Sequence, residues 1–185
     1  MHLVVLVLFF GVASGTVDYK GRATVKDVLD FFKTGEVIAL ARRSYTRHIN
    51  DFEPRCMKTV VKEQLENASM LFAQSYLYGK TRVEKNMTAH VFRKPGLDSA
   101  PVMVVEPRDS DKDYMSFRMY DFEYYDDKEK CAVITFTEKP CNTKCELHVW
   151  LKGGSGAYHN CLLEYNYLCG HRKYYNLYNH RDCGF

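Results

Sequence analysis

The segment YMSFRMYDFEYYDDKEKCAVITFT, residues 114–137, contains two strand-like runs separated by a turn. In the first run Met115, Phe117 and Met119 alternate with polar residues, so that the apolar side chains fall on one face. The acidic and basic residues at 126–128 are typical of a turn, and the second run is almost entirely apolar. Alternation with a period of two is the pattern of a half-buried strand, and we therefore predict two consecutive strands here.

The same pattern extends outward along most of the chain. Six further strands, separated by turn residues such as Gly79 and Pro95, are predicted at 37–41, 57–63, 69–78, 83–92, 102–105 and 146–151. Together with 114–125 and 132–137 they make eight strands in regular succession, which fits an up-and-down barrel or a sandwich.

A helix is predicted on each side of this strand region. Residues 25–34 have apolar positions at helical spacing, with Thr24 as N-cap and Gly35 as the stop. Apolar residues recur at three- and four-residue spacing again at 158–168, and Gly170 ends that helix. A late helix outside eight strands favours a closed antiparallel barrel over a sandwich.

The N-terminus has the pattern of a secretory signal peptide. An uninterrupted apolar run at 3–10 is followed by small residues that include Ala13 and Gly15. We predict a signal peptide at 1–15, a single domain at 16–185, and a secreted, extracellular protein. The run is too short to span a bilayer, although a membrane anchor is the alternative.

Seven cysteines follow, which in a secreted protein indicate a disulfide framework with one cysteine left free, capped or joined to another chain. The alternative is a zinc site formed by Cys141, Cys145, Cys161 and Cys169. Asn67 and Asn86 lie in glycosylation sequons, in agreement with secretion.

Composition and motifs argue against two other classes of protein. The formal net charge of the 185 residues is +3, and no basic run of the kind found in nucleic-acid binders is present in the sequence. The sequence contains no nucleophile elbow, phosphate-binding loop or zinc-protease helix. We predict that the chain is not an enzyme and needs no cofactor or metal.

An ordered set of pieces resembles the tick salivary lipocalins, the family that includes the histamine-binding proteins. The pieces are Cys56 before the second strand, CAV at 131–133, CELHVW at 145–150, Cys161 with LCG at 168–170, and the ending that contains Cys183. The resemblance implies an eight-stranded antiparallel up-and-down lipocalin barrel with a short N-terminal helix and a C-terminal helix packed outside.

The resemblance also implies a pairing of cysteines. It joins Cys56 to Cys183, Cys131 to Cys161, and Cys145 to Cys169. Cys141 is then left over as a possible intermolecular link in a chain that we otherwise expect to be a monomer.

Two positions depart from the pattern of amine-binding members of the family. In those members an Asp follows the cysteine of the seventh strand, and an aromatic residue follows Glu-Leu in the eighth. Here these positions are Ala132 and His148. Ala132 cannot hold a protonated amine by a charge-assisted hydrogen bond, so the resemblance supports the fold and weakens histamine or serotonin as the ligand.

A barrel of eight strands has room for one small ligand, and its walls come from alternate residues. We predict that the ligand-binding wall contains Met70, Phe72, Tyr76, Met115, Phe117, Met119, Ile134 and Phe136, with Leu147, Val149 and Leu151 as one face of the last strand. The alternative is that these side chains fill a closed core.

Five polar residues are candidates for the interior: Arg43, Arg118, Glu123, His148 and His159. Arg43 either meets a carboxylate or hydroxyl of the ligand or faces water at a strand end. Arg118 is expected to face outward, and His148 to lie at the surface or rim.

The first functional hypothesis is a secreted carrier that sequesters a hydrophobic or amphipathic mediator, such as a sterol, fatty acid or eicosanoid, and thereby modulates host inflammation or immunity. Binding of a biogenic amine is an alternative. Another is immunomodulation through contact of the outer surface with a host immune protein or cell, for which the Tyr-rich segment 165–178, with Arg172 and Tyr174, is the candidate surface.

Overall fold

The structure is a computed structural model that describes residues 22–49, 52–95, 99–108, 117–138, 142–152, 156–170, 174–178 and 180–183. The predictions for the signal peptide 1–15, Met115, Cys141 and Arg172 lie outside these residues. Among the helices of the described ranges, none is long and apolar enough to cross a membrane.

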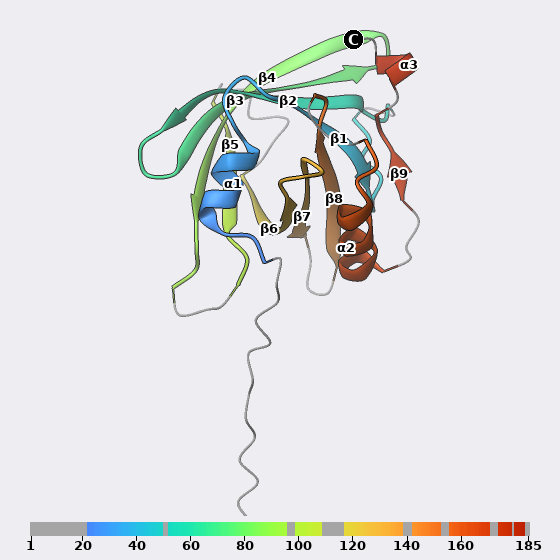
Figure 1. The fold of residues 1–185 in the computed structure, drawn as a ribbon. Coiled ribbons are helices and arrows are strands. Elements are labelled where there is room, and N and C mark those ends of the chain that lie inside the picture. Colours follow the sequence, from blue (N-terminus) through green and yellow to red (C-terminus); the bar gives the residue numbers. More distant parts are fainter. Residues whose placement is uncertain are drawn as a thin grey trace, which may run out of the picture.

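Eight strands of the described chain close into an antiparallel barrel (Figure 1). They are β1 (Val37–Arg43), β2 (Arg55–Leu65), β3 (Ser69–Tyr78), β4 (Thr81–Phe92), β5 (Val102–Pro107), β6 (Arg118–Asp126), β7 (Cys131–Thr137) and β8 (Thr143–Trp150). Each strand from β2 to β7 pairs with the next in sequence, and β1 pairs with both β8 and β2. The predicted up-and-down barrel is confirmed.

The helix α1 (Val25–Phe31) packs into one end of the barrel. Its start is fixed by the predicted cap, because the Thr24 hydroxyl accepts from the Asp27 N–H and the Asp27 carboxylate accepts from the Thr24 N–H. Phe31 is fully buried against Phe122, and the Trp150 indole N–H donates to the Phe31 carbonyl at 2.9 Å. The helix therefore completes the interior core at this end.

The helix α2 (His159–Cys169) lies outside the barrel against β8 (Figure 1). Its buried Tyr165 belongs to a second apolar cluster together with Val133, Leu147 and Val149. The outer face of β7 and β8 is thus covered by a helix instead of by water.

The C-terminal segment bridges a gap between β1 and β2, and it was not predicted. These two strands meet through only three residue pairs, from Val37 with Val60 to Ala39 with Lys58. Beyond them, the N–H of Leu177 donates to the Ala41 carbonyl and the Leu177 carbonyl accepts from the Cys56 N–H, both at 3.0 Å. Around Leu177 lie the short strand β9 (Tyr175–Asn176), paired with β1, and α3 (His180–Cys183).

Three disulfides fasten these peripheral elements to the barrel. Cys131–Cys161 and Cys145–Cys169 join α2 to β7 and β8, and Cys56–Cys183 joins α3 to β2. They are the same three pairs that the family resemblance implies. The sulfurs of Cys145, Cys161 and Cys169 are therefore not thiolates available to zinc, which removes the alternative of a zinc site at these positions.

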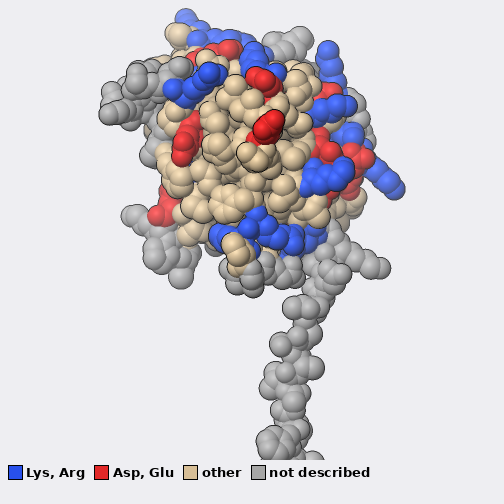
Figure 2. Space-filling model, turned by 90° about the vertical axis from the view of Figure 1, so that its left-hand side faces the viewer, with Lys and Arg blue, Asp and Glu red and all other residues tan. Residues whose placement is uncertain are grey.

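The outer surface carries the two sequons and mixed charge. Asn67 is exposed in the turn between β2 and β3, and Asn86 is exposed on β4, so both positions are accessible to a glycosyltransferase; their glycosylation stays a prediction. On the face shown in Figure 2, acidic and basic side chains are interspersed among uncharged ones. This face therefore has no electrostatic patch of a single sign.

The turn between β6 and β7 gives the fold a pH dependence. Asp126 accepts from the N–H groups of Lys128 and Glu129 at 2.9 Å and from the Asn160 side chain at 2.7 Å. Partial burial acts to raise the pKa of Asp126, but the Asn160 and backbone hydrogen bonds outweigh it, and the pKa lies below its ordinary value.

We expect Asp126→Asn to destabilise the protein at pH 6 and to have a smaller effect at pH 3. A carboxylate with a lowered folded-state pKa contributes its full stability above the unfolded-state pKa, about 3.9, and loses it as the pH falls through the folded-state value. Urea unfolding of both proteins at the two pH values measures this. A difference in unfolding free energy that does not narrow at pH 3 would contradict the assignment.

Candidate functional site

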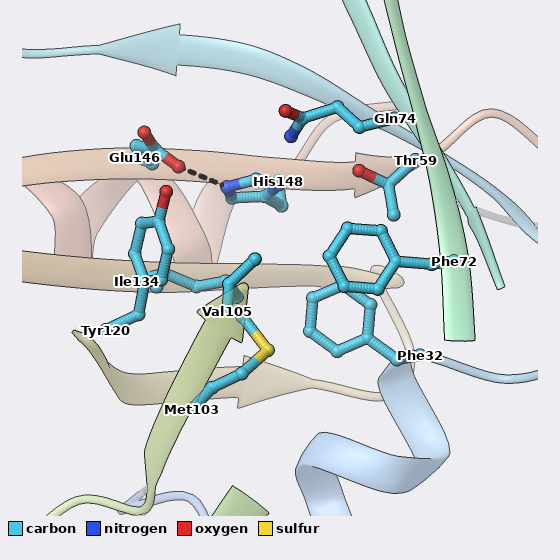
Figure 3. A pocket seen from close by; sticks show the side chains of 10 residues that line it. All are labelled: Phe32, Thr59, Phe72, Gln74, Met103, Val105, Tyr120, Ile134, Glu146 and His148. Atoms are coloured by element: carbon cyan, nitrogen blue, oxygen red, sulfur yellow. Dashed lines mark hydrogen bonds and ion pairs between the residues drawn. The ribbon is translucent and has the colours of Figure 1, made fainter. Parts of the chain in front are cut away.

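A pocket lies inside the barrel, between the α1 end and the start of β8. Its lining divides into an apolar wall and a polar wall (Figure 3). The apolar side chains are Phe32, Phe72, Met103, Val105 and Ile134, and the polar ones are Thr59, Gln74, Tyr120, Glu146 and His148. An apolar lining with a few converging polar groups is the usual make-up of a small-ligand site.

The pocket is narrow. The cavity volume is about 30 Å³, whereas the free space between the lining atoms, including the opening toward solvent, is about 380 Å³. The first figure is room for about two water molecules, since one water needs roughly 10–15 Å³ of such volume. A larger guest must displace side chains, and the buried Met70, Met87 and Met103 supply an adaptable interior for this.

A buried Glu146–His148 pair is the centre of the polar wall. The two residues lie two positions apart on β8, and both therefore point to the inner face. The His148 Nε2 lies 2.8 Å from Glu146 Oε2, and the Tyr45 hydroxyl donates to Glu146 Oε1. Both carboxylate oxygens are thus hydrogen-bonded within the protein.

These contacts keep Glu146 ionised in the interior. Burial acts to raise the pKa of Glu146, but the hydrogen bond and charge of His148, then the Tyr45 hydroxyl and Arg118, lower it below its ordinary value. Burial beside this carboxylate raises the pKa of the Tyr120 hydroxyl instead, so Tyr120 stays a neutral donor. The polar wall therefore contains one fixed negative charge surrounded by donors.

Arg43 lies inside the barrel. A bulge between Leu40 and Arg42 shifts the register, and Arg43 then pairs with Glu146 across β1 and β8 on the inner face. Its side chain is fully buried, and its Nη2 lies 2.6 Å from Glu53 Oε1. Within the described chain its Nε and Nη1 have no hydrogen-bond partner. The exposed strand-end alternative is wrong, and a role in ligand binding stays a prediction.

Most of the predicted wall lies inside the barrel. Met70, Phe72, Ile134 and Phe136 belong to the interior core, and Phe72 and Ile134 also line the pocket. Tyr76 is half-buried in a smaller cluster with Leu40, Met57 and Leu177. Contact of any of these side chains with a ligand remains a prediction.

The predicted facing of β6 is wrong. Phe117 and Met119 are 56% and 41% exposed on the outside. Tyr120 and Phe122 face the core instead, and Arg118 shares their inner face, with its guanidinium 4.4 Å from the Phe136 ring. Apolar residues occupy both faces of this strand, so the alternation at 115–119 did not identify the inner one.

The predicted facing of β8 is wrong for a different reason. Leu147 and Val149, with Leu151 beyond them, pack in the outer cluster against α2, whereas His148 lines the pocket. The more apolar face of β8 is covered by a helix, and the barrel interior receives the hydrogen-bonded Glu146–His148 pair. Two polar residues at alternate positions between Cys145, Leu147 and Val149 were a signal that could have identified this pair.

The remaining candidates lie outside the pocket. Glu123 is half-buried and accepts from the Thr135 hydroxyl at 3.0 Å, and His159 is exposed at the start of α2. In the Tyr-rich segment Tyr165 is buried between α2 and the barrel, while the Tyr174 ring stacks on Arg42 at 3.8 Å. Most of its aromatic rings thus contact the protein itself, although Tyr167 is 77% exposed.

Comparison of the sequence with known families agrees with this architecture. Residues 20–184 match the family described as tick histamine binding protein. The chain belongs to this family. No curated protein matches the chain.

Two solved structures resemble this chain in fold. Japanin from Rhipicephalus appendiculatus, bound to cholesterol, is 16% identical with a TM-score of 0.53, and the match covers 80% of this chain and 95% of japanin. The cockroach allergen Per a 4 is 9% identical with a TM-score of 0.50, covering 77% and 81% of the two chains. At this identity the two likenesses show the fold alone.

Proposed function

We propose that the protein is a secreted carrier that holds one small amphipathic ligand inside its barrel. The ligand's neutral polar group, a hydroxyl above all, meets Thr59, Gln74, Tyr120 and the Glu146–His148 pair, and its apolar body lies against the opposite wall. The two-sided pocket of Figure 3 is the observation that carries this proposal. Binding alone is the mechanism, and its effect is removal of a mediator from host tissue.

A sterol is one ligand with this chemistry, since it joins a single hydroxyl to an apolar body. Japanin is bound to cholesterol. A rigid ligand of that size needs more room than the narrow pocket offers, so its binding requires movement of the methionine and aromatic side chains. A hydroxylated fatty acid or eicosanoid shares the same chemistry and bends more easily.

A protonated amine is the second candidate, favoured by the ionised Glu146 and by the name of the family. The two candidates are separated by native mass spectrometry and organic extraction of protein secreted from eukaryotic cells, followed by titration with dehydroergosterol and with histamine. A stoichiometric neutral lipid, or saturable sterol binding, supports the first. Binding of histamine alone would overturn it.

We expect Val105→Trp to weaken binding of the neutral ligand by about tenfold or more, the effect of losing ~1.4 kcal/mol. Val105 lines the pocket, and an indole there fills its free space. Met119→Trp is the matched control, because Met119 lies outward on the neighbouring strand and is 41% exposed. Fluorescence titration of both variants measures the effect. Equal loss of binding in both would place the ligand elsewhere.

A further inference from the structure

The Glu146 carboxylate in the pocket already has partners for both oxygens. His148 lies 2.8 Å from Oε2 and the Tyr45 hydroxyl donates to Oε1, with Glu146 and His148 only 5% and 8% exposed. In Figure 3 the His148 ring lies between Glu146 and the other polar groups of the wall, Thr59 and Gln74. A guest in the pocket therefore meets a carboxylate whose two oxygens already have protein partners.

The charges around Glu146 also disfavour a protonated amine in the pocket. Arg118, on the inner face of β6, interacts favourably with Glu146, and Arg43 lies on β1 directly opposite Glu146. Tyr45 and Tyr120 face the carboxylate with hydroxyl groups. An incoming ammonium group would have to displace His148 and sit among these cations, whereas a neutral hydroxyl can bond to the wall as it stands.

We infer that His148 determines which class of ligand the pocket accepts. While its imidazole holds Glu146, the pocket prefers a neutral hydroxylated head group; with an apolar side chain at position 148, one carboxylate oxygen is released and the same pocket accepts a protonated amine. This inference rests on the proposed function for the site, although it makes its own prediction about the substituted protein. His148 is a specificity-determining residue in this account.

A matched pair of probes isolates the head group. Tryptophol and tryptamine share the indole and ethyl chain and differ in a hydroxyl against an ammonium group at neutral pH. Isothermal titration of the wild-type protein should show tighter binding of tryptophol. In His148→Phe the affinity for tryptamine should rise by about tenfold or more, a gain of ~1.4 kcal/mol, and the preference should reverse.

Three further variants test the cause of the change. His148→Gln retains a donor for Glu146 and should keep the wild-type preference. The double variant His148→Phe with Glu146→Gln removes the released charge and should lose the gained tryptamine binding. His148→Met serves if the Phe variant does not give a wild-type circular dichroism spectrum.

The outcomes separate this inference from the carrier proposal. No gain of tryptamine affinity in a folded His148→Phe or His148→Met protein overturns the inference, whatever the wild type binds. Tighter binding of tryptamine than of tryptophol by the wild type overturns it as well. A wild type that binds neither probe nor a sterol overturns the carrier proposal and the inferred preference together. Absence of sterol binding alone, with tryptophol preferred by the wild type and tryptamine by the variant, contradicts only the proposed natural ligand.

Discussion

Replacing Cys56 and Cys183 together with serine is expected to lower the free energy of unfolding by about 5 kcal/mol, the largest loss among the three disulfides. This bond joins residues 127 positions apart, whereas the other two span 30 and 24. A longer loop restricts the unfolded chain more, and the loop of Cys131–Cys161 corresponds to about 3.5 kcal/mol. Replacing both cysteines leaves no free thiol from the pair.

Urea unfolding of the two double-serine variants, Cys56 with Cys183 and Cys131 with Cys161, measures this difference. The second variant is the control, because it also removes a buried disulfide but closes a much shorter loop. A loss for the Cys56–Cys183 variant equal to or smaller than that of the control would contradict the chain-entropy explanation.

Phe31→Ala is expected to cost about 3–5 kcal/mol, the range for a fully buried phenylalanine. Its ring is 0% exposed and has the rings of Phe32, Phe122, Tyr125 and Trp150 around it, with centroids 5.1–6.4 Å away. The substitution leaves a cavity where α1 enters the barrel, next to a wall of the pocket. Chemical unfolding at neutral pH gives the value.

Leu163→Ala is the control for Phe31→Ala. Leu163 lies on α2 and is 57% exposed, so its truncation should change the unfolding free energy by no more than ~0.5 kcal/mol. A loss below ~1 kcal/mol for Phe31→Ala would mean that α1 is not part of the cooperative core.

The strand order was predictable because short stretches of the sequence identify each strand and each turn. Each predicted strand overlaps an observed one, and the Thr24 cap and the Gly170 end of α2 are where the residue types place them. Consecutive antiparallel strands need only short turns, so an up-and-down order follows from the succession itself. The cysteine pairs, in contrast, came from the family resemblance and not from spacing.

The inner face of β6 and β8 could not be read from alternation alone. A period of two separates the faces of a strand, but which face is inside depends on what covers the other. Leu147 and Val149 look like an interior wall until α2 is placed over them. On β6, Phe117 and Met119 are followed by Tyr120 and Phe122 on the opposite face, so both faces carry apolar residues.

The polar wall was missed for a related reason. His148 lies on the face opposite Leu147 and Val149, and it was assigned to the surface or rim because that apolar face was expected to point inward. Its partner Glu146 is on the same strand, and Tyr45 reaches the carboxylate from the segment after β1. The hydrogen bond between Tyr45 and Glu146 joins residues 101 positions apart, and it exists only because the barrel closes.

The backbone bridge of Leu177 between β1 and β2 must form later in synthesis than the strands that it connects. Leu177 is synthesised long after β1 and β2, yet its backbone is needed to connect Ala41 with Cys56. The part of the β1–β2 connection that passes through Leu177, and the oxidation of Cys183 with Cys56, can therefore form only after residues 177–183 have been synthesised. A chain terminated short of Leu177 keeps unpaired strand edges, the feature through which β-proteins associate with one another.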